Sequence, residues 1–208
     1  MKLLENILIQ SGYGLNHKEE THIAWMVLYW NLQIYKRPKW NSELEIKTWV
    51  REFSKISSWR EFEIYCEGEK IGIAISEWVA IDTLKNALSK MTDDMVEKYG
   101  ICEKTAYDKK LTGRLKEPEK LEKIYEYTAK RRDLDTNNHV NNTIYLEYAY
   151  DALPEGLSLN FNNIEIYYKK QIKLGDTICC LYSNEDDTHT VVIKSADEKI
   201  LHAILKFY

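Results

Sequence analysis

One pattern of strands occurs twice along this chain, and it restricts the fold more than any other feature of the sequence. Within Thr21–Tyr35 every second residue from Ala24 to Ile34 is apolar, which is typical of a long β-strand with one apolar face. The segment Asn31–Leu44 aligns without gaps with the segment Glu165–Ile178, and Ala74 then corresponds to Ala203. This repetition predicts two similarly folded units within one chain.

Each unit is expected to combine one helix with antiparallel strands. The first unit is expected to have a helix over residues 2–15 and strands over residues 21–35, 43–53, 59–67 and 71–82. The second is expected to have a strand over residues 123–132, a helix ending near Pro154 and Gly156, and strands over residues 161–173, 176–183, 188–195 and 198–208. We therefore predict an α+β fold of two tandem helix-plus-antiparallel-sheet units, the first lacking its initial strand.

The repeat also predicts where the units begin and end. We place the first unit at residues 1–90, a connection at residues 91–122 and the second unit at residues 123–208. The connection is charged and contains a short helix, with Thr92 as its N-terminal cap and Gly100 at its end.

Composition excludes several classes of function. The 33 acidic residues outnumber the 29 Lys and Arg residues, for a net charge of −4, and the basic residues form local pairs, so we predict no nucleic-acid partner. No apolar run approaches the ~20 residues that span a bilayer, and the polar beginning of the chain is unlike a signal peptide, so we predict no membrane partner.

The cysteines and histidines do not indicate a metal site. The four cysteines lack metal-ligand spacing, and a bridge between the neighbours Cys179 and Cys180 would be strained, so we expect reduced thiols and a cytoplasmic protein. No His or Cys pair has a matching second pair, and the chain contains no Gly-rich phosphate loop or serine elbow. We therefore predict no metal and no cofactor.

The segment from Arg131 to Asn142 concentrates the side chains that suit catalysis. Asp135, Asn137 and His139 stand two positions apart, so an extended backbone would project all three on one side. A carboxylate and a carboxamide can orient an imidazole, whose ordinary pKa near ~6.5 suits proton transfer. Asn141 or Asn142 is expected to cap the following helix, and backbone N–H groups at Val140 and Asn141 are candidate oxyanion donors.

This segment, followed by a Tyr-rich helix, resembles the signature of plant and bacterial acyl-ACP thioesterases. Two further segments, Tyr35–Val50 and Glu77–Asp82, resemble the first half of that family. The resemblance implies a double hotdog fold, hydrolysis of acyl-ACP to a free fatty acid, and Asp135, Asn137 and His139 as the catalytic residues. It also implies that the first unit binds the acyl chain and that the second is catalytic.

The chain departs from the family at one position that bears on the chemistry. The family has an acidic residue on the strand after the helix, where this sequence has Gln171, and a carboxamide can hold a water or a thioester by hydrogen bonds but is not a base. The role of Asp135 as base, nucleophile or orienting group stays open. The alternatives are an acyl-CoA thioesterase and a non-catalytic module that binds acyl thioesters or fatty acids.

The resemblance also implies the partner. The neighbouring Arg131 and Arg132 are candidates for contact with an acidic acyl carrier protein or with the phosphate of its phosphopantetheine. Since both units lie in one chain, we expect either a monomer or a homodimer.

Overall fold

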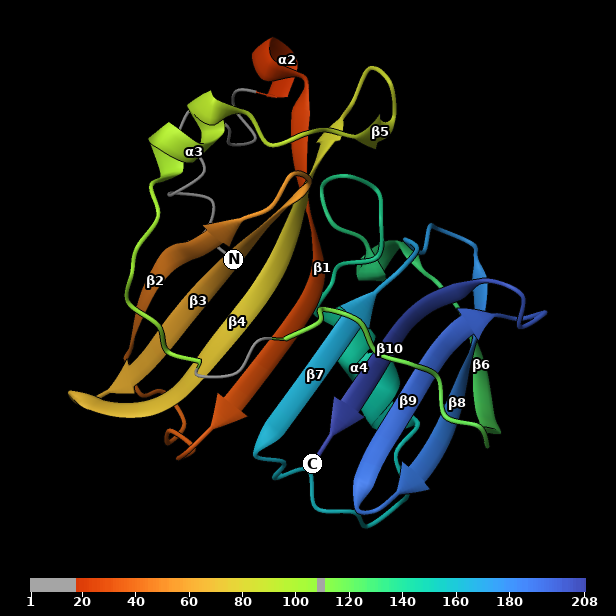
Figure 1. The fold of residues 1–208 in the computed structure, drawn as a ribbon. Coiled ribbons are helices and arrows are strands. Elements are labelled where there is room, and N and C mark those ends of the chain that lie inside the picture. Colours follow the sequence, from red (N-terminus) through yellow and green to blue (C-terminus); the bar gives the residue numbers. More distant parts are fainter. Residues whose placement is uncertain (1–17, 108–110) are drawn as a thin grey trace. The chain divides into compact units, whose positions relative to one another are not determined.

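The computed structural model describes residues 18–107 and 111–208 (Figure 1). These residues form two compact units, which consist of Met1–Leu28 with Lys36–Leu111 and of Tyr29–Tyr35 with Thr112–Tyr208. The helix expected over residues 2–15 lies outside the described residues. No helix in the described part of the chain is long and apolar enough to cross a membrane.

Unit 1 is built on an antiparallel sheet with the strand order β2-β3-β4-β1. Its elements are α2 (Lys18–Thr21), the first part of β1 (Ile23–Ile34), β2 (Leu44–Phe53), β3 (Ser57–Cys66), β4 (Glu69–Asp82), β5 (Ala87–Leu88) and α3 (Asp93–Tyr99). The turn between β3 and β4 has φ values of 51° at Glu67 and 79° at Gly68, the left-handed backbone that suits a tight hairpin. Within residues 18–107 no strand corresponds to the first strand of unit 2, β6 (Glu122–Thr128).

The short helix α3 begins and ends where the sequence predicts. The Thr92 hydroxyl accepts the N–H of Met95 at 3.3 Å, and the N–H of Gly100 donates to the carbonyl of Val96 at 2.9 Å. Gly100 adopts a φ of 67°, which ends the helix at low conformational cost. Met95, 1% exposed, anchors the helix in unit 1.

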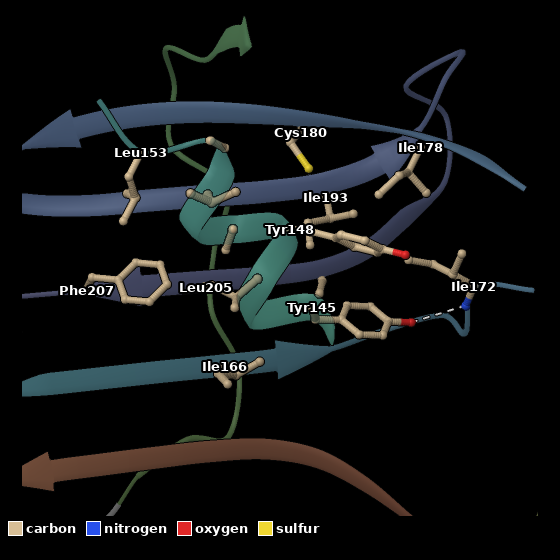
Figure 2. Close-up of a cluster of buried hydrophobic side chains, with 14 of the residues drawn as sticks. Tyr145, Tyr148, Leu153, Ile166, Ile172, Ile178, Cys180, Ile193, Leu205 and Phe207 are labelled. Atoms are coloured by element: carbon tan, nitrogen blue, oxygen red, sulfur yellow. Dashed lines mark hydrogen bonds between the residues drawn. The ribbon is translucent and has the colours of Figure 1, made fainter. Parts of the chain in front are cut away.

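Unit 2 consists of one helix packed against an antiparallel sheet, whose strands lie in the order β1-β7-β10-β9-β8-β6. Its elements are β6 (Glu122–Thr128), the 3-10 turn η2 (Arg131–Asp133), α4 (Ile144–Asp151), β7 (Asn163–Tyr168), β8 (Thr177–Glu185), β9 (Thr188–Ser195) and β10 (Leu201–Phe207). Figure 2 shows α4 lying across the sheet, with Tyr145, Tyr148 and Leu205 among the side chains of the shared core. Burial of these large apolar surfaces holds the helix in place.

Two expected strands are shorter than the alternation of residues suggests. The strand expected over residues 123–132 ends at Thr128, and the chain then turns through η2. The strand expected over residues 161–173 ends at Tyr168 because Ile172 makes its backbone hydrogen bonds outside the ladder, to Val140 and Tyr145. Both shortenings lie beside the segment that was predicted to be catalytic.

Candidate active site

The segment around Asp135 is a closed turn and not an extended strand. Asp135 Oδ1 accepts the N–H groups of Asn137 at 2.8 Å and His139 at 3.2 Å, and the Asp135 N–H donates to the carbonyl of His139 at 2.8 Å. Asn138 completes the turn with a φ of 60°. The prediction that an extended backbone aligns the three side chains is therefore wrong, because the Asp135 carboxylate bends the chain around itself.

This turn determines which polar atoms of the predicted triad are available. Asp135 Oδ1 is occupied, whereas Oδ2 has no hydrogen-bond partner in the part of the chain that the structure describes. His139 is half-buried and Asn137 is exposed. Among residues 18–107 and 111–208, no hydrogen bond joins the side chains of Asp135, Asn137 and His139.

The backbone after the turn is committed to the neighbouring segments. The Val140 N–H donates to the carbonyl of Ile172 at 2.9 Å, and the Asn141 N–H donates to the carbonyl of Asp133 at 2.8 Å. The prediction that these two N–H groups are free oxyanion donors is therefore wrong. Between Val140 and the start of α4, the N–H of Asn142 has no acceptor among the described residues, whereas the N–H of Thr143 donates to Asn141 Oδ1.

The prediction that Asn141 or Asn142 caps α4 is wrong, because the N-cap position is Thr143, whose side chain makes no capping hydrogen bond. Asn141 instead holds the turn that precedes the helix. Its Oδ1 accepts both the N–H and the hydroxyl of Thr143 at 3.0 Å, and its carbonyl accepts the N–H of Ile144 at 2.9 Å. Asn142 instead offers its carbonyl to the hydroxyl of Tyr168 at 3.0 Å. The turn before the helix is thus held from both sides.

Gln171 lies next to the turn, although it is not on a strand. Its neighbour Ile172 accepts from Val140 through its carbonyl and donates its N–H to the Tyr145 hydroxyl at 3.2 Å, the contact drawn in Figure 2. A bridge between His139 and Lys173 continues the pairing. On the other side, the carbonyl of Lys170 contacts Nδ1 of buried His202 at 2.9 Å. The tertiary structure therefore brings exposed Gln171 beside the predicted triad.

Asp133 is a supporting residue that the sequence analysis missed. It is 5% exposed, and its Oδ2 accepts the Tyr127 hydroxyl at 2.9 Å, the Tyr148 hydroxyl at 3.1 Å and the Lys130 N–H at 2.7 Å. Burial alone would raise the pKa of Asp133, but these three donors outweigh it, so its pKa lies below the ordinary value. Asp133 begins the turn, and its carbonyl also receives the N–H of Asn141.

Tyr145 links the helix to the Gln171 segment. Burial, together with the charge of Asp135, raises the pKa of Tyr145 to about 12, so its hydroxyl stays protonated at neutral pH. No local sequence signal distinguishes Tyr145 from the other tyrosines of α4, because the group it serves, the Ile172 N–H, lies 27 positions away.

The two predicted carrier-binding arginines are exposed on η2. Arg132 Nε lies 3.7 Å from Asp133 Oδ1. The interaction of Arg132 with Tyr127, followed by the charge of Asp133, raises the pKa of Arg132.

The described residues contain no group of three or more His, Cys, Asp and Glu side chains that is arranged to hold a metal ion.

Two family models cover most of the sequence. The N-terminal domain of acyl-ACP thioesterases matches residues 6–99, and the C-terminal domain matches residues 116–206. The chain belongs to the acyl-ACP thioesterase family. The turn around Asp135, helix α4 and Gln171 all lie within the C-terminal domain of this family.

Relatives of this acyl-ACP thioesterase family member include plant proteins. It is 29% identical over 186 residues to an oleoyl-acyl carrier protein thioesterase, chloroplastic, of Coriandrum sativum, a match over 83% of this chain and 50% of that relative. An Arabidopsis thaliana protein of the same description is 27% identical over 183 residues, covering 82% of this chain and 50% of the relative. The chain thus spans about half the length of the curated relatives it matches.

Solved structures show the fold of this family member. An acyl-ACP thioesterase from Bacteroides thetaiotaomicron superimposes with a TM-score of 0.86 at 21% identity, covering 98% of this chain and 84% of the other. The 12:0-ACP thioesterase from Umbellularia californica gives 0.80 at 18% identity, covering 99% and 85%. The predicted α+β double hotdog fold is confirmed.

Proposed function

We propose that this chain hydrolyses an acyl-ACP thioester to a free fatty acid and the carrier thiol. Membership of the acyl-ACP thioesterase family supports this reaction class. The observation that carries the proposal is the turn from Asp135 to His139, which contacts from Asp133, Ile172 and Asn141 hold beside Gln171, shortly before α4. A rigid turn of this kind keeps catalytic groups in place without the entropy cost of ordering them for each turnover.

In the proposed mechanism, His139 is the group that moves protons. Imidazole is the side chain whose ordinary pKa lies nearest neutrality, so it can take a proton from water and return it to the leaving thiolate. Asp135 Oδ1 holds the turn by two N–H groups, which leaves Oδ2 to orient water or to attack the thioester carbonyl. Asn137 is proposed to contact the substrate or the water, since its side chain is exposed at the turn.

Of the predicted oxyanion candidates Val140, Asn141 and Gln171, only Gln171 can still serve, so a further donor is needed. With the N–H groups of Val140 and Asn141 engaged, we assign this role to the N–H of Asn142 and the carboxamide of Gln171. Gln171 cannot take a proton as a carboxylate does, so it supplies hydrogen bonds and leaves the proton transfer to His139 and Asp135.

The carrier and the setting are also part of the proposal. Arg131 and Arg132 are exposed next to Asp133 and are proposed to meet an acidic carrier protein or the phosphate of its prosthetic group. A monomer or homodimer in the cytoplasm remains our expectation. The four cysteines, which are free thiols, support a reducing compartment.

The test is steady-state hydrolysis of acyl-ACP and acyl-CoA substrates of increasing chain length, by the parent and by His139→Asn. The matched control is His22→Asn, which changes an exposed histidine of unit 1 whose φ of 54° asparagine also tolerates. We expect turnover of acyl-ACP to fall at least ~100-fold in His139→Asn, the usual contribution of general acid–base catalysis, and to stay unchanged in the control.

Three other results would change the assignment. Faster hydrolysis of acyl-CoA than of acyl-ACP would make acyl-CoA, and not acyl-ACP, the substrate. Near-normal turnover by His139→Asn would remove His139 from the mechanism. An inert parent that gains activity through Gln171→Glu would indicate a binding module that lacks the essential carboxylate.

A further inference from the structure

A pocket of about 290 Å³ lies within unit 1, and none of its lining residues belongs to the proposed mechanism. Strands β2 and β3 form one side, and the chain leaving α3 forms the other, where the Cys102 N–H donates to the carbonyl of Val50 at 2.9 Å. The pocket is lined by Thr48, Trp49, Val50, Arg60, Tyr99, Gly100, Ile101 and Cys102. Its volume is at the lower end of the ~300–1,000 Å³ that small-molecule sites occupy.

Arg60 is the unusual member of this lining. The residue is 8% exposed, and its Nη1 reaches the Thr48 hydroxyl at 3.4 Å, a long hydrogen bond. No carboxylate lies within ion-pair distance of Arg60 among residues 18–107 and 111–208. Burial lowers the pKa of Arg60, yet a guanidinium keeps its proton in proteins, so within the described part of the chain Arg60 carries a buried charge without a counter-ion.

The other buried charges of β3 have partners. Glu61, which is fully buried, pairs with Arg51 at 2.7 Å, and Glu63 pairs with Lys70 at 2.8 Å and with Lys104. Unit 1 thus neutralises each buried acid on this strand but leaves its one buried base without a counter-ion in the described residues. A buried charge is retained without a partner at a large energetic cost, which a bound anion would offset.

We propose that this pocket binds a carboxylate attached to a short apolar group, with Arg60 as its bidentate donor. The planar fork of a guanidinium matches a carboxylate, and the Thr48 hydroxyl can donate to it as well. A single buried cation balances the single charge of a carboxylate, whereas a phosphate carries more charge than this pocket compensates. The apolar residues Val50 and Ile101 in the lining suit an apolar tail.

Short fatty acids belong to this ligand class, so the site would respond to the product of the reaction proposed above. That connection rests on the proposed function, but the binding site does not. Binding is therefore measured without any thioester, and an inactive protein that binds the acid would refute only the proposed hydrolysis.

The first experiment titrates the full chain with octanoate by calorimetry. The neutral probe is 1-octanol, and octyl phosphate separates a phosphate from a carboxylate. Arg60→Met is compared with Arg114→Met, which removes an exposed arginine of unit 2. We expect octanoate to bind the parent and Arg114→Met equally and Arg60→Met at least ~10-fold more weakly, since a charge-assisted bidentate contact is lost. Equal binding by Arg60→Met, or tighter binding of 1-octanol or octyl phosphate, would overturn the proposal.

The second experiment needs no change at Arg60. Cys102 is exposed and lines the pocket, so its alkylation by a maleimide reports occupancy. In the Cys66→Ser variant, Cys102 is the exposed cysteine, and the remaining Cys179 and Cys180 are buried. Saturating octanoate should slow the alkylation of Cys102 in this variant several-fold. An unchanged rate at saturation would mean that octanoate binds elsewhere, and the assignment of this pocket would fail.

Discussion

Replacing Asp133 by asparagine tests whether this buried carboxylate holds the proposed catalytic turn. Its Oδ2 accepts two tyrosine hydroxyls and one backbone N–H, at 2.7–3.1 Å. Hydrogen bonds to a charged group contribute about 1.5–3 kcal/mol, and those to neutral groups about 1 kcal/mol. The charge thus adds about 0.5–2 kcal/mol to each bond, and its loss from all three should lower the free energy of unfolding of unit 2 by about 2–6 kcal/mol.

The measurement is native-state amide exchange in the central strands β8 and β9, which reports the unfolding of unit 2 itself. The control is Asp187→Asn, an exposed turn residue with a φ of 59° that asparagine tolerates. A double-mutant cycle with Tyr148→Phe should give a coupling energy of about 1 kcal/mol. A change within about 0.5 kcal/mol of the control, or strictly additive effects in the cycle, would refute the reasoning.

The same variant should alter the response to pH. The pKa of Asp133 is lower in the folded protein than its ordinary value, so its contribution to stability is complete above the unfolded pKa of ~3.9. It is lost as the pH falls through the folded pKa. The stability difference between the parent and Asp133→Asn should therefore be constant near neutrality and shrink in acid, and a difference that grows in acid would contradict this.

Two further variants test contacts within each unit. Tyr145→Phe removes the acceptor of the buried Ile172 N–H, so it should destabilise unit 2 by about 1–3 kcal/mol. Because the Gln171 segment then loosens, the variant should also lower kcat more than it raises KM. Amide protection at Ile172 equal to that of the parent would disprove this contact. Arg51→Met leaves fully buried Glu61 without its cation and should lower the free energy of unfolding of unit 1 by about 3 kcal/mol in urea titration, whereas Lys55→Met on the surface serves as the unchanged reference.

Local patterns in the sequence were sufficient for most of the fold. The alternation from Thr21 to Tyr35 corresponds to β1, and Thr92 and Gly100 bound α3 as predicted. These features depend on residues a few positions apart, whose geometry the backbone itself imposes. The motif around Asp135 and His139 was found in the same way, because its polar residues are contiguous.

The arrangement within the motif followed from contacts that no local pattern reveals. Alternate spacing suggested an extended backbone, but the Asp135 carboxylate prefers the nearby N–H groups and closes a turn. The N–H groups of Val140 and Asn141 were predicted to be free, yet each finds a carbonyl, that of Ile172 or of Asp133. Buried backbone donors are almost always paired, and a single sequence does not identify the partner.

The sequence by itself therefore predicted two α+β units and the position of the candidate motif, and its resemblance to acyl-ACP thioesterases implied the double hotdog fold. Only the tertiary structure decided that Asp133 anchors the turn and that Gln171 lies beside it. It also decided that Glu61 and Glu63 have counter-ions, whereas Arg60 has none among the residues that the structure describes. The physical reason is the distance along the sequence over which each kind of interaction acts. Side-chain periodicity is a property of adjacent residues, whereas burial and pairing of a charge depend on segments that meet only when the chain has folded.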